Sequence, residues 1–181
     1  MERVAVYIDG GMFFEGLHAQ GFSTDLRYSD LFADLANCAP VELTDICFFM
    51  AAYPEGPYPQ KCELQQDFFK RLEDEGIQVV PGVTEIRGGM FIERHVEAAL
   101  ATALVEGALT DRFDRALLIS RRAAFAPSVS AAIRAGKTVQ AAFFRYTFDP
   151  ADGLAEVATL TTDVTKKKIV QYTRSGPIPH H

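Results

Sequence analysis

The sequence has few cysteines, no excess of positive charge and no long apolar run, and each absence excludes a class of protein. Its three cysteines, Cys38, Cys47 and Cys62, are widely spaced and odd in number, which fits neither a disulfide framework nor a zinc site. A formal net charge of -6 excludes a general nucleic-acid coat, so any contact with nucleic acid needs a local basic patch. No apolar stretch could span a bilayer, and the first predicted strand leaves no room for a signal peptide. We therefore expect a cytoplasmic protein with no membrane partner.

Internal repeats, low-complexity segments and interdomain linkers are also lacking. The 181 residues suit one domain with a substantial core, or one domain with an appendage. Turn-forming residues at 149–153 interrupt the pattern of the preceding chain. We therefore predict a main domain over residues 1–148 and a C-terminal extension over residues 149–181.

The main domain alternates between apolar runs typical of buried strands and segments typical of helices. The predicted strands cover residues 3–8, 45–53, 77–81, 115–120 and 138–144, and the predicted helices cover 13–21, 31–36, 61–75, 93–109 and 124–135. This alternation predicts an α/β fold with a mostly parallel sheet of about five strands, flanked by helices on both faces.

Two further segments carry weaker signals. The pair Gly88-Gly89 stands between two short apolar runs and predicts a tight hairpin. In the C-terminal extension, residues 154–160 are typical of a short helix, and residues 166–172 of an edge strand or a mobile tail.

The first predicted strand ends in Asp9, followed by two glycines. Ligands in open parallel α/β sheets bind beyond the carboxyl ends of the strands, so Asp9 is a candidate to contact a metal or a substrate. It is equally a candidate N-cap for the helix that follows. The residues leave both interpretations open.

Three segments, in this order along the chain, resemble the NYN domains of the LabA type, also called DUF88, which belong to the PIN-like nucleases. They are residues 4–10 (VAVYIDG), residues 93–102 (ERHVEAALAT), and the last core unit with its ALLIS, FAP and GKTV segments at 116–120, 125–127 and 136–139. The resemblance covers about residues 3 to 144. It implies a three-layer PIN-like fold in which acidic residues at the carboxyl edge of the sheet bind Mg²⁺ or Mn²⁺ and hydrolyse RNA. Hard divalent cations prefer such carboxylate oxygens and activate water beside the phosphate.

The sequence departs from this family pattern at the positions that would hold the metal. Met12 replaces the usual Asn, Glu97 replaces a shorter acid, and Ala103 stands where a further acid is expected. The usual Ser-Gly-Asp-x-Asp-Phe turn reads Ser-Arg-Arg-Ala-Ala-Phe over residues 120–125. Only Asp9 and Glu97 remain as matched acids, and two arginines have entered the turn. A cation close to the metal position repels the ion and competes for its ligands.

These departures predict a pseudonuclease that has lost ordinary metal-dependent cleavage and binds an anionic ligand, either RNA or a phosphorylated or carboxylated small molecule. Guanidinium groups near a helix start favour such anions. The predicted ligand-binding residues are Met12, Arg94, His95, Ser120, Arg121 and Arg122, and the candidate catalytic residues are Asp9 and Glu97. The opposing interpretation is that Arg121 and Arg122 pair with the acids and close an obsolete metal site.

Other functions stay open at this point. A weak ribonuclease would bind Mg²⁺ or Mn²⁺ through Asp9 and Glu97, whereas no cofactor is expected otherwise. The scaffold could also serve a small-molecule enzyme, because a fold does not fix a function. A homodimer is a further prediction, since some of the many phenylalanines could line a dimer face. Arg94 and Glu97 are three residues apart, so we expect them to share one helix face.

Overall fold

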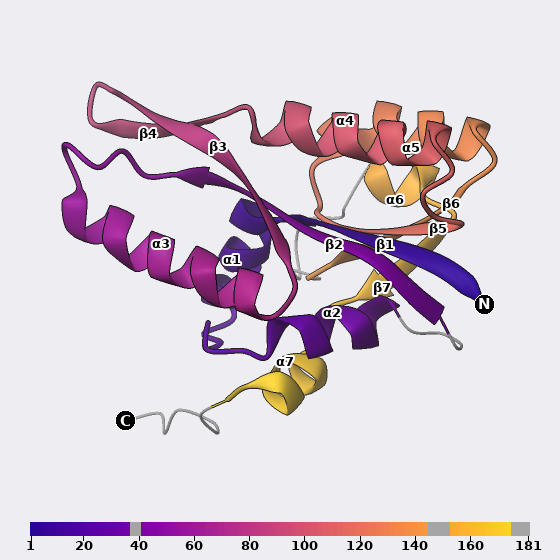
Figure 1. Ribbon diagram of the computed structural model, residues 1–181, viewed down its shortest axis with the longest axis horizontal. Coiled ribbons are helices and arrows are strands. Elements are labelled where there is room, and N and C mark those ends of the chain that lie inside the picture. Colours follow the sequence, from indigo (N-terminus) through magenta and orange to yellow (C-terminus); the bar gives the residue numbers. More distant parts are fainter. Residues whose placement is uncertain (37–40, 145–152, 175–181) are drawn as a thin grey trace.

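The computed structural model describes residues 1–36, 41–144 and 153–174, and shows a three-layer α/β fold (Figure 1). The strands are β1 (Glu2–Asp9), β2 (Val41–Ala52), β3 (Gln78–Arg87), β4 (Met90–Arg94), β5 (Arg115–Ile119), β6 (Thr138–Phe143) and β7 (Leu160–Asp163). The helices are α1 (Gly10–Ala19), α2 (Tyr28–Ala36), α3 (Pro59–Asp74), α4 (Val96–Leu109), η1 (Ala123–Phe125), α5 (Ala126–Arg134), α6 (Leu154–Val157) and α7 (Lys166–Tyr172). Cys38, the predicted domain boundary at 148/149 and the last part of the tail lie outside the described residues.

The seven strands form one sheet in the order β4-β3-β2-β1-β5-β6-β7, with β1 at its centre. All neighbouring strands are parallel except β3 and β4, which pair in antiparallel fashion. The α/β class and the mostly parallel sheet are therefore confirmed. The expected number of about five strands is too low, because β4 and β7 extend the two edges.

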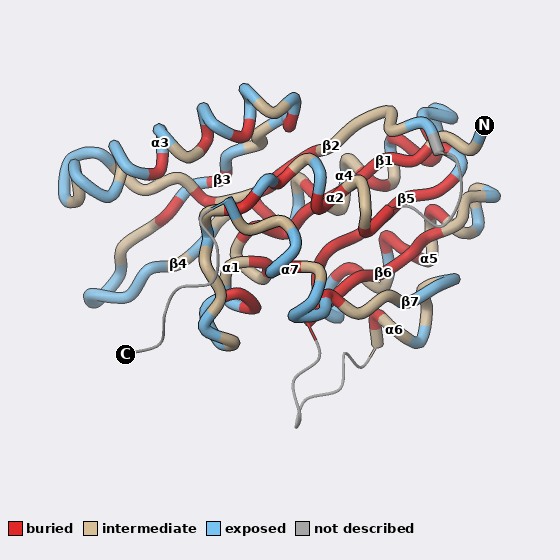
Figure 2. Tube along the Cα trace, turned by 90° about the horizontal axis from the view of Figure 1, so that it is seen from below, coloured by how far each residue is buried: buried red, intermediate tan, exposed pale blue. Residues whose placement is uncertain are grey.

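Alternation along β1 shows how the sheet separates two apolar cores. Val4, Val6 and Ile8 belong to the core beneath α1, α2, α3 and α7, whereas Ala5 and Tyr7 belong to the core beneath α4, α5 and α6. Successive side chains of a strand point to opposite faces, so a strand buried on both sides has no polar alternation. The central strands are buried along most of their length. Helix α3 and the β3–β4 hairpin lie at one end of the molecule, and many of their residues are exposed (Figure 2).

The Gly88-Gly89 hairpin is confirmed. Both glycines have positive φ, 57° and 77°, a conformation that side chains with a Cβ rarely adopt. The pairing runs from Arg87 with Met90 as far as Val83 with Arg94. Strand β4 therefore continues through Glu93 and Arg94, and the helix predicted from residue 93 begins only at Val96.

The C-terminal residues differ from the expectation in one respect. Residues 154–157 form the predicted short helix α6, and the next strand, β7, pairs with β6. Residues 166–172 form helix α7 rather than an edge strand or a tail, and the Thr165 hydroxyl accepts a hydrogen bond from the Lys168 N–H as its N-cap. In the part of the chain that the structure describes, no helix combines the length and hydropathy needed to cross a membrane.

Candidate functional site

The carboxyl ends of β1 and β5 bring Asp9 and Ser120 together at the centre of the sheet edge. The Ser120 hydroxyl donates to Asp9 Oδ2 at 3.0 Å, and the backbone N–H of Met12 donates to Asp9 Oδ1 at 3.3 Å. Asp9 is therefore the N-cap of α1, and its side chain is completely buried. The N-cap interpretation is therefore confirmed, whereas contact of Asp9 with a metal or a substrate stays a prediction.

Arg122 lies in the loop between β5 and η1, and its guanidinium contacts three carboxylates. Nε lies 3.1 Å from Asp9 Oδ2, Nη1 lies 2.6 Å from Glu97 Oε1, and Nη2 lies 3.2 Å from Glu93 Oε2. The Arg122 backbone N–H also donates to the Ser120 hydroxyl at 3.1 Å. Each of the three guanidinium nitrogens therefore has a carboxylate partner. These contacts connect β1, β4 and α4 with the loop that follows β5. We call Asp9, Glu93, Glu97 and Arg122 the Arg122 cluster.

Burial decreases from the centre of the Arg122 cluster to its rim. The Asp9 side chain is 0% exposed, Arg122 27%, Glu93 34% and Glu97 50%. Burial raises the pKa of Asp9, and this effect outweighs the opposing attraction of Arg122 and the hydrogen bonds from Met12 and Ser120. Burial would by itself lower the pKa of Arg122, but Asp9, Glu97 and Glu93 together raise it. Arg122 is therefore permanently charged.

Glu93 is the member of the Arg122 cluster that the sequence did not predict. The helix predicted from residue 93 would have placed Glu93 one helical turn before Glu97 on the same helix. In the structure it lies in the hairpin strand β4, one residue before the end of that strand, and a Cβ on Gly11 would lie 3.1 Å from Glu93 Oε1. Gly11 thus leaves the space that this carboxylate occupies. The signal lay in the hairpin, because pairing β4 residue by residue with β3 carries the strand through Glu93.

The other predicted residues lie near the Arg122 cluster or face elsewhere. Met12, Ser120 and Arg121 line a cavity of about 10 Å³, which has room for little more than a water molecule. Arg94 belongs to β4 and pairs with Glu85 at 3.3 Å, so the prediction that Arg94 and Glu97 share a helix face is wrong. His95 precedes α4 in a left-handed conformation, φ 71°, and lines a separate cavity with Ala103.

A divalent metal does not fit the Arg122 cluster as it stands. Three carboxylates supply the hard oxygen ligands that Mg²⁺ and Mn²⁺ prefer, but the guanidinium lies among them. Within the described residues, no group of three or more His, Cys, Asp or Glu side chains is arranged to hold a metal ion. With all groups ionised, three negative charges face one positive charge.

A larger groove begins next to the Arg122 cluster and runs between α1 and α3. It has a volume of about 930 Å³ and is mainly apolar; its lining includes Gly11, Phe14, Met50, Tyr53, Leu64 and Phe68. At its far end the ammonium of Lys61 lies between 5.1 and 5.6 Å from the ring centres of Tyr53, Tyr58 and Phe91. The groove lies on the side of the sheet opposite to α4.

Comparison with known proteins agrees with this architecture. The NYN domain family matches residues 3–164. A crystal structure of a protein of unknown function from Vibrio parahaemolyticus RIMD 2210633 superposes with a TM-score of 0.68, at 17% sequence identity, over 91% of this chain and 94% of that chain. This second likeness supports the fold alone. None of the curated proteins compared with the chain matches it significantly. The family match extends over most of the chain, and the chain therefore belongs to the NYN domain family.

Proposed function

We propose that this NYN domain has lost ordinary metal-dependent ribonuclease activity because Arg122 occupies the place of the catalytic cation. The single observation that carries the proposal is the contact of one guanidinium with Asp9, Glu93 and Glu97 at 2.6 to 3.2 Å. We further propose, from the three resembling segments, the LabA or DUF88 subtype, and from the sparse cysteines a cytoplasmic location.

The guanidinium is a fixed cation that a metal ion would have to displace. Mg²⁺ requires oxygen ligands at about 2.0–2.1 Å in octahedral geometry, and these carboxylates are spread around a much larger planar group. Displacement removes several charge-assisted hydrogen bonds and turns Arg122 into a positive charge beside the ion. The raised pKa of Asp9 adds proton competition at the most buried ligand. Each effect lowers the affinity for metal.

The experiment compares metal binding and RNA cleavage in four proteins. These are the wild type, Arg122→Ala, Arg122→Ala with Asp9→Asn, and Arg134→Ala as an exposed-arginine control. Each is melted with and without Mn²⁺ and incubated with single-stranded RNA. We expect a Mn²⁺-dependent rise in melting temperature in Arg122→Ala alone, because removal of the guanidinium frees three carboxylates and Asp9→Asn withdraws one of them. The wild type and Arg134→Ala should neither cleave RNA nor respond to Mn²⁺.

One result would overturn the proposal directly. If the wild type cleaves RNA with Mn²⁺ and Asp9→Asn abolishes the cleavage, Arg122 is a displaceable group and the protein is a weak Mg²⁺- or Mn²⁺-dependent endonuclease. Glu93 favours this alternative, because it supplies a third carboxylate beyond the two that match the family pattern.

Binding of an anionic ligand at the Arg122 cluster stays a prediction, and the charges around Arg122 oppose it. The excess of negative charge around Arg122 opposes RNA phosphate or a phosphorylated small molecule, unless the ligand displaces Glu93 and Glu97, the two partly exposed acids. Melting the wild type with inorganic phosphate tests this point. Stabilisation that is lost in Arg122→Ala supports an anion site, and no shift argues against one.

A small-molecule enzyme is the second candidate, favoured by the groove between α1 and α3. Its volume of about 930 Å³ is within the range of small-molecule sites, and it reaches Gly11 beside Glu93. Phe68→Ala would enlarge the groove without touching the Arg122 cluster. If turnover of a candidate substrate changes in Phe68→Ala and is abolished in Asp9→Asn, the groove serves the acidic site.

A further inference from the structure

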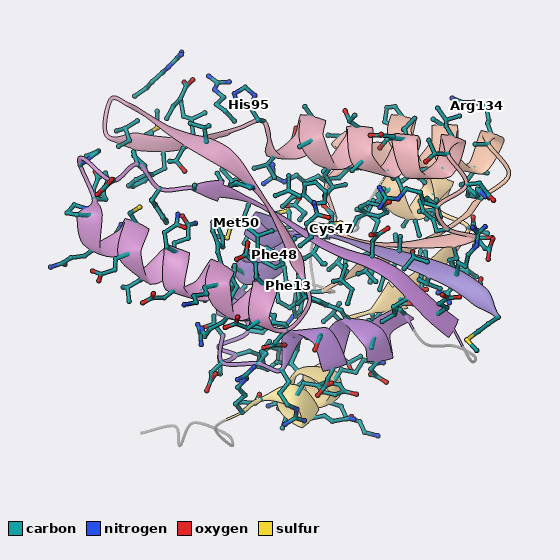
Figure 3. The ribbon with its side chains drawn as sticks, in the orientation of Figure 1. Phe13, Cys47, Phe48, Met50, His95 and Arg134 are labelled. Carbon is teal, nitrogen blue, oxygen red and sulfur yellow. The ribbon has the colours of Figure 1, made fainter. Side chains whose placement is uncertain are left out.

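A second cavity lies on the opposite face of the sheet, between α4 and strands β2 and β3. Its volume is about 460 Å³. Strands β2 and β3 continue past the start of α4 toward the β3–β4 hairpin (Figure 1). Cys47 lies below α4 and His95 beside the start of that helix (Figure 3). The lining residues come from β1, β2, β3, α4 and the turn after α4, and none of them belongs to the Arg122 cluster.

The sequence leaves this space open because one face of α4 carries short side chains. Ala98, Ala99, Ala103 and Gly107 line the cavity from the helix, and their spacing of one, four and four residues places them on adjacent rows of the helix surface. Larger side chains there would pack onto the strands and fill the gap. This part of the cavity wall is therefore apolar, with Thr102 and Glu106 of α4 beside it.

The floor carries the hydroxyl group of Tyr7, which is accessible from the cavity. Tyr7 is 4% exposed, and its hydroxyl makes no hydrogen bond with any described residue. A Cβ on Gly107 would lie 2.7 Å from that oxygen, so the hydroxyl reaches across the cavity floor to α4. Burial raises the pKa of Tyr7, which keeps the phenol protonated and able to donate. The hydroxyl therefore offers a hydrogen-bond donor to a ligand in the cavity.

Further groups on the floor define the shape and polarity of the ligand. The rings of Tyr7 and Phe49 lie with their centroids 6.4 Å apart and 31° between their planes, which gives an aromatic surface opposite the alanines. The Cys47 thiol donates to Gln78 Oε1 at 3.7 Å, and burial raises the pKa of Cys47 to about 11. This part of the floor is therefore aromatic, and its phenol and thiol groups are uncharged.

The charges at the rim disfavour an anion. Arg112 contacts Asp45 at 3.2 Å, and Glu106 has no ion-pair partner among the described residues. The charges of Arg112 and Asp45 cancel each other. The remaining charge of Glu106 therefore gives the rim of the cavity a negative potential. A phosphate or carboxylate would be repelled, whereas a neutral ligand would not.

We propose that the cavity between α4 and strands β2 and β3 binds a neutral, flat heteroaromatic molecule of nucleoside size that accepts a hydrogen bond from the Tyr7 hydroxyl. The volume is within the range of small-molecule sites. The site is separate from the Arg122 cluster, and neither depends on the other.

The test measures binding of adenosine, guanosine, cytidine and uridine to the full chain by calorimetry. At least one nucleoside should bind saturably, and its 5′-monophosphate should bind more weakly because of Glu106. Tyr7→Phe removes only the hydroxyl and should weaken binding about fivefold or more, the effect of one lost hydrogen bond. Ala103→Leu should abolish binding by filling the cavity.

The matched control is Tyr28→Phe. Tyr28 is also buried, at 3% exposure, but lies in the opposite core and donates to the Thr24 carbonyl. Tyr28→Phe should leave nucleoside binding unchanged. Melting curves of all variants verify that they fold. The proposal is overturned if none of the four nucleosides binds, or if binding is the same in Tyr7→Phe and Ala103→Leu as in the wild type. It is also overturned if the wild type is a dimer that Ala103→Leu converts to a monomer, since a second copy would then occupy the cavity.

Discussion

Two arginines lie at the two ends of β5, and their surroundings differ in a way that separates structure from function. Arg115, at the start of the strand, is 3% exposed and has one carboxylate partner, Glu2. Its other hydrogen bonds go to the Ala36 carbonyl and the Gln140 amide oxygen, which are neutral. Arg122, just beyond the end of the strand, has three carboxylates around it.

The number of carboxylates around each arginine indicates whether the arginine has a structural role alone. At Arg115 one negative charge balances one positive charge, and neutral acceptors satisfy the remaining donors, as a buried structural cation needs. At Arg122 acids are in excess, which a stabilising ion pair alone does not require. This excess is what a cation-binding edge would contain, and the guanidinium now occupies it. The four predictions below test this contrast, from the largest expected effect to the smallest.

Arg115→Met should cause the largest loss of stability. It leaves the Ala36 carbonyl and the Gln140 side chain without this donor inside the protein, so the free energy of unfolding should fall by about 2–4 kcal/mol. Urea denaturation measures the loss. Arg27→Met is the control, because Arg27 is 46% exposed and pairs with an exposed Asp30, so about 1 kcal/mol or less is expected. Equal losses in the two variants would show that Arg115 is not a buried structural cation.

Arg122→Ala should cost less than Arg115→Met, about 1–3 kcal/mol, since two of its three partners can turn to water. The loss arises mainly from Asp9, which would stay buried without its cation. Adding Asp9→Asn should therefore recover part of the loss, as measured by a double-mutant cycle in urea. Mn²⁺ should restore stability to Arg122→Ala but not to Arg115→Met. Restoration of both would mean that the metal acts outside the Arg122 cluster.

The pH dependence should show opposite signs at two aspartates. The folded pKa of Asp9 is raised, so the folded protein keeps a proton that the unfolded chain releases above a pH of about 4. Stability from this group falls as the pH rises through that window and then levels off. The stability of Asp9→Asn relative to the wild type should therefore increase from pH 4 upward. Denaturation at a series of pH values measures the difference.

Asp114 provides the control for this measurement. Hydrogen bonds from Arg3 lower its pKa to about 2, so its contribution is present above the unfolded pKa and is lost as the pH falls toward 2. Asp114→Asn should therefore become less stable relative to the wild type as the pH rises from 2 to 4. The same slope in both variants would contradict the assignment of opposite shifts.

Gly11→Ala should have the smallest effect. The new Cβ would lie 3.1 and 3.3 Å from the two Glu93 oxygens, so the carboxylate has to move by a few tenths of an ångström. We expect a loss below about 1 kcal/mol, because Glu93 is partly exposed and can adjust. Gly16→Ala is the contrast, since its Cβ would lie 2.0 Å from the buried Phe144 ring. A larger loss in Gly11→Ala than in Gly16→Ala would mean that Glu93 is held rigidly.

Prediction from sequence was most successful where local pattern and burial agree. The runs that form β1, β2, β5 and β6 are apolar along most of their length, because both faces of the sheet are covered. The hairpin followed from the two glycines and the short apolar runs on either side of them. The edge strand that was not predicted, β7, is short, mixed in composition and paired with only one strand of the described sheet, β6.

The candidate site was predicted in part. Asp9, Ser120 and Arg122 meet because the carboxyl ends of parallel strands share one edge, and Glu97 reaches them from the first turn of α4. Arg94 and Glu93 were misplaced for one reason: the helix was expected to begin three residues before Val96. Successive side chains of β4 point to opposite faces of the sheet, so Arg94 contacts Glu85 whereas Glu93 contacts Arg122. A helix over these residues would not have separated their side chains in this way.

The sequence by itself determined the α/β class, the central strands and the entry of two arginines into a turn where acids were expected. These depend on local hydrophobic pattern and on the identity of single residues. Only the tertiary structure decided that Arg122 would contact three carboxylates and that Tyr7 would face an open cavity. Both depend on which side chains from distant strands and helices meet, and such contacts are set by packing across the whole sheet.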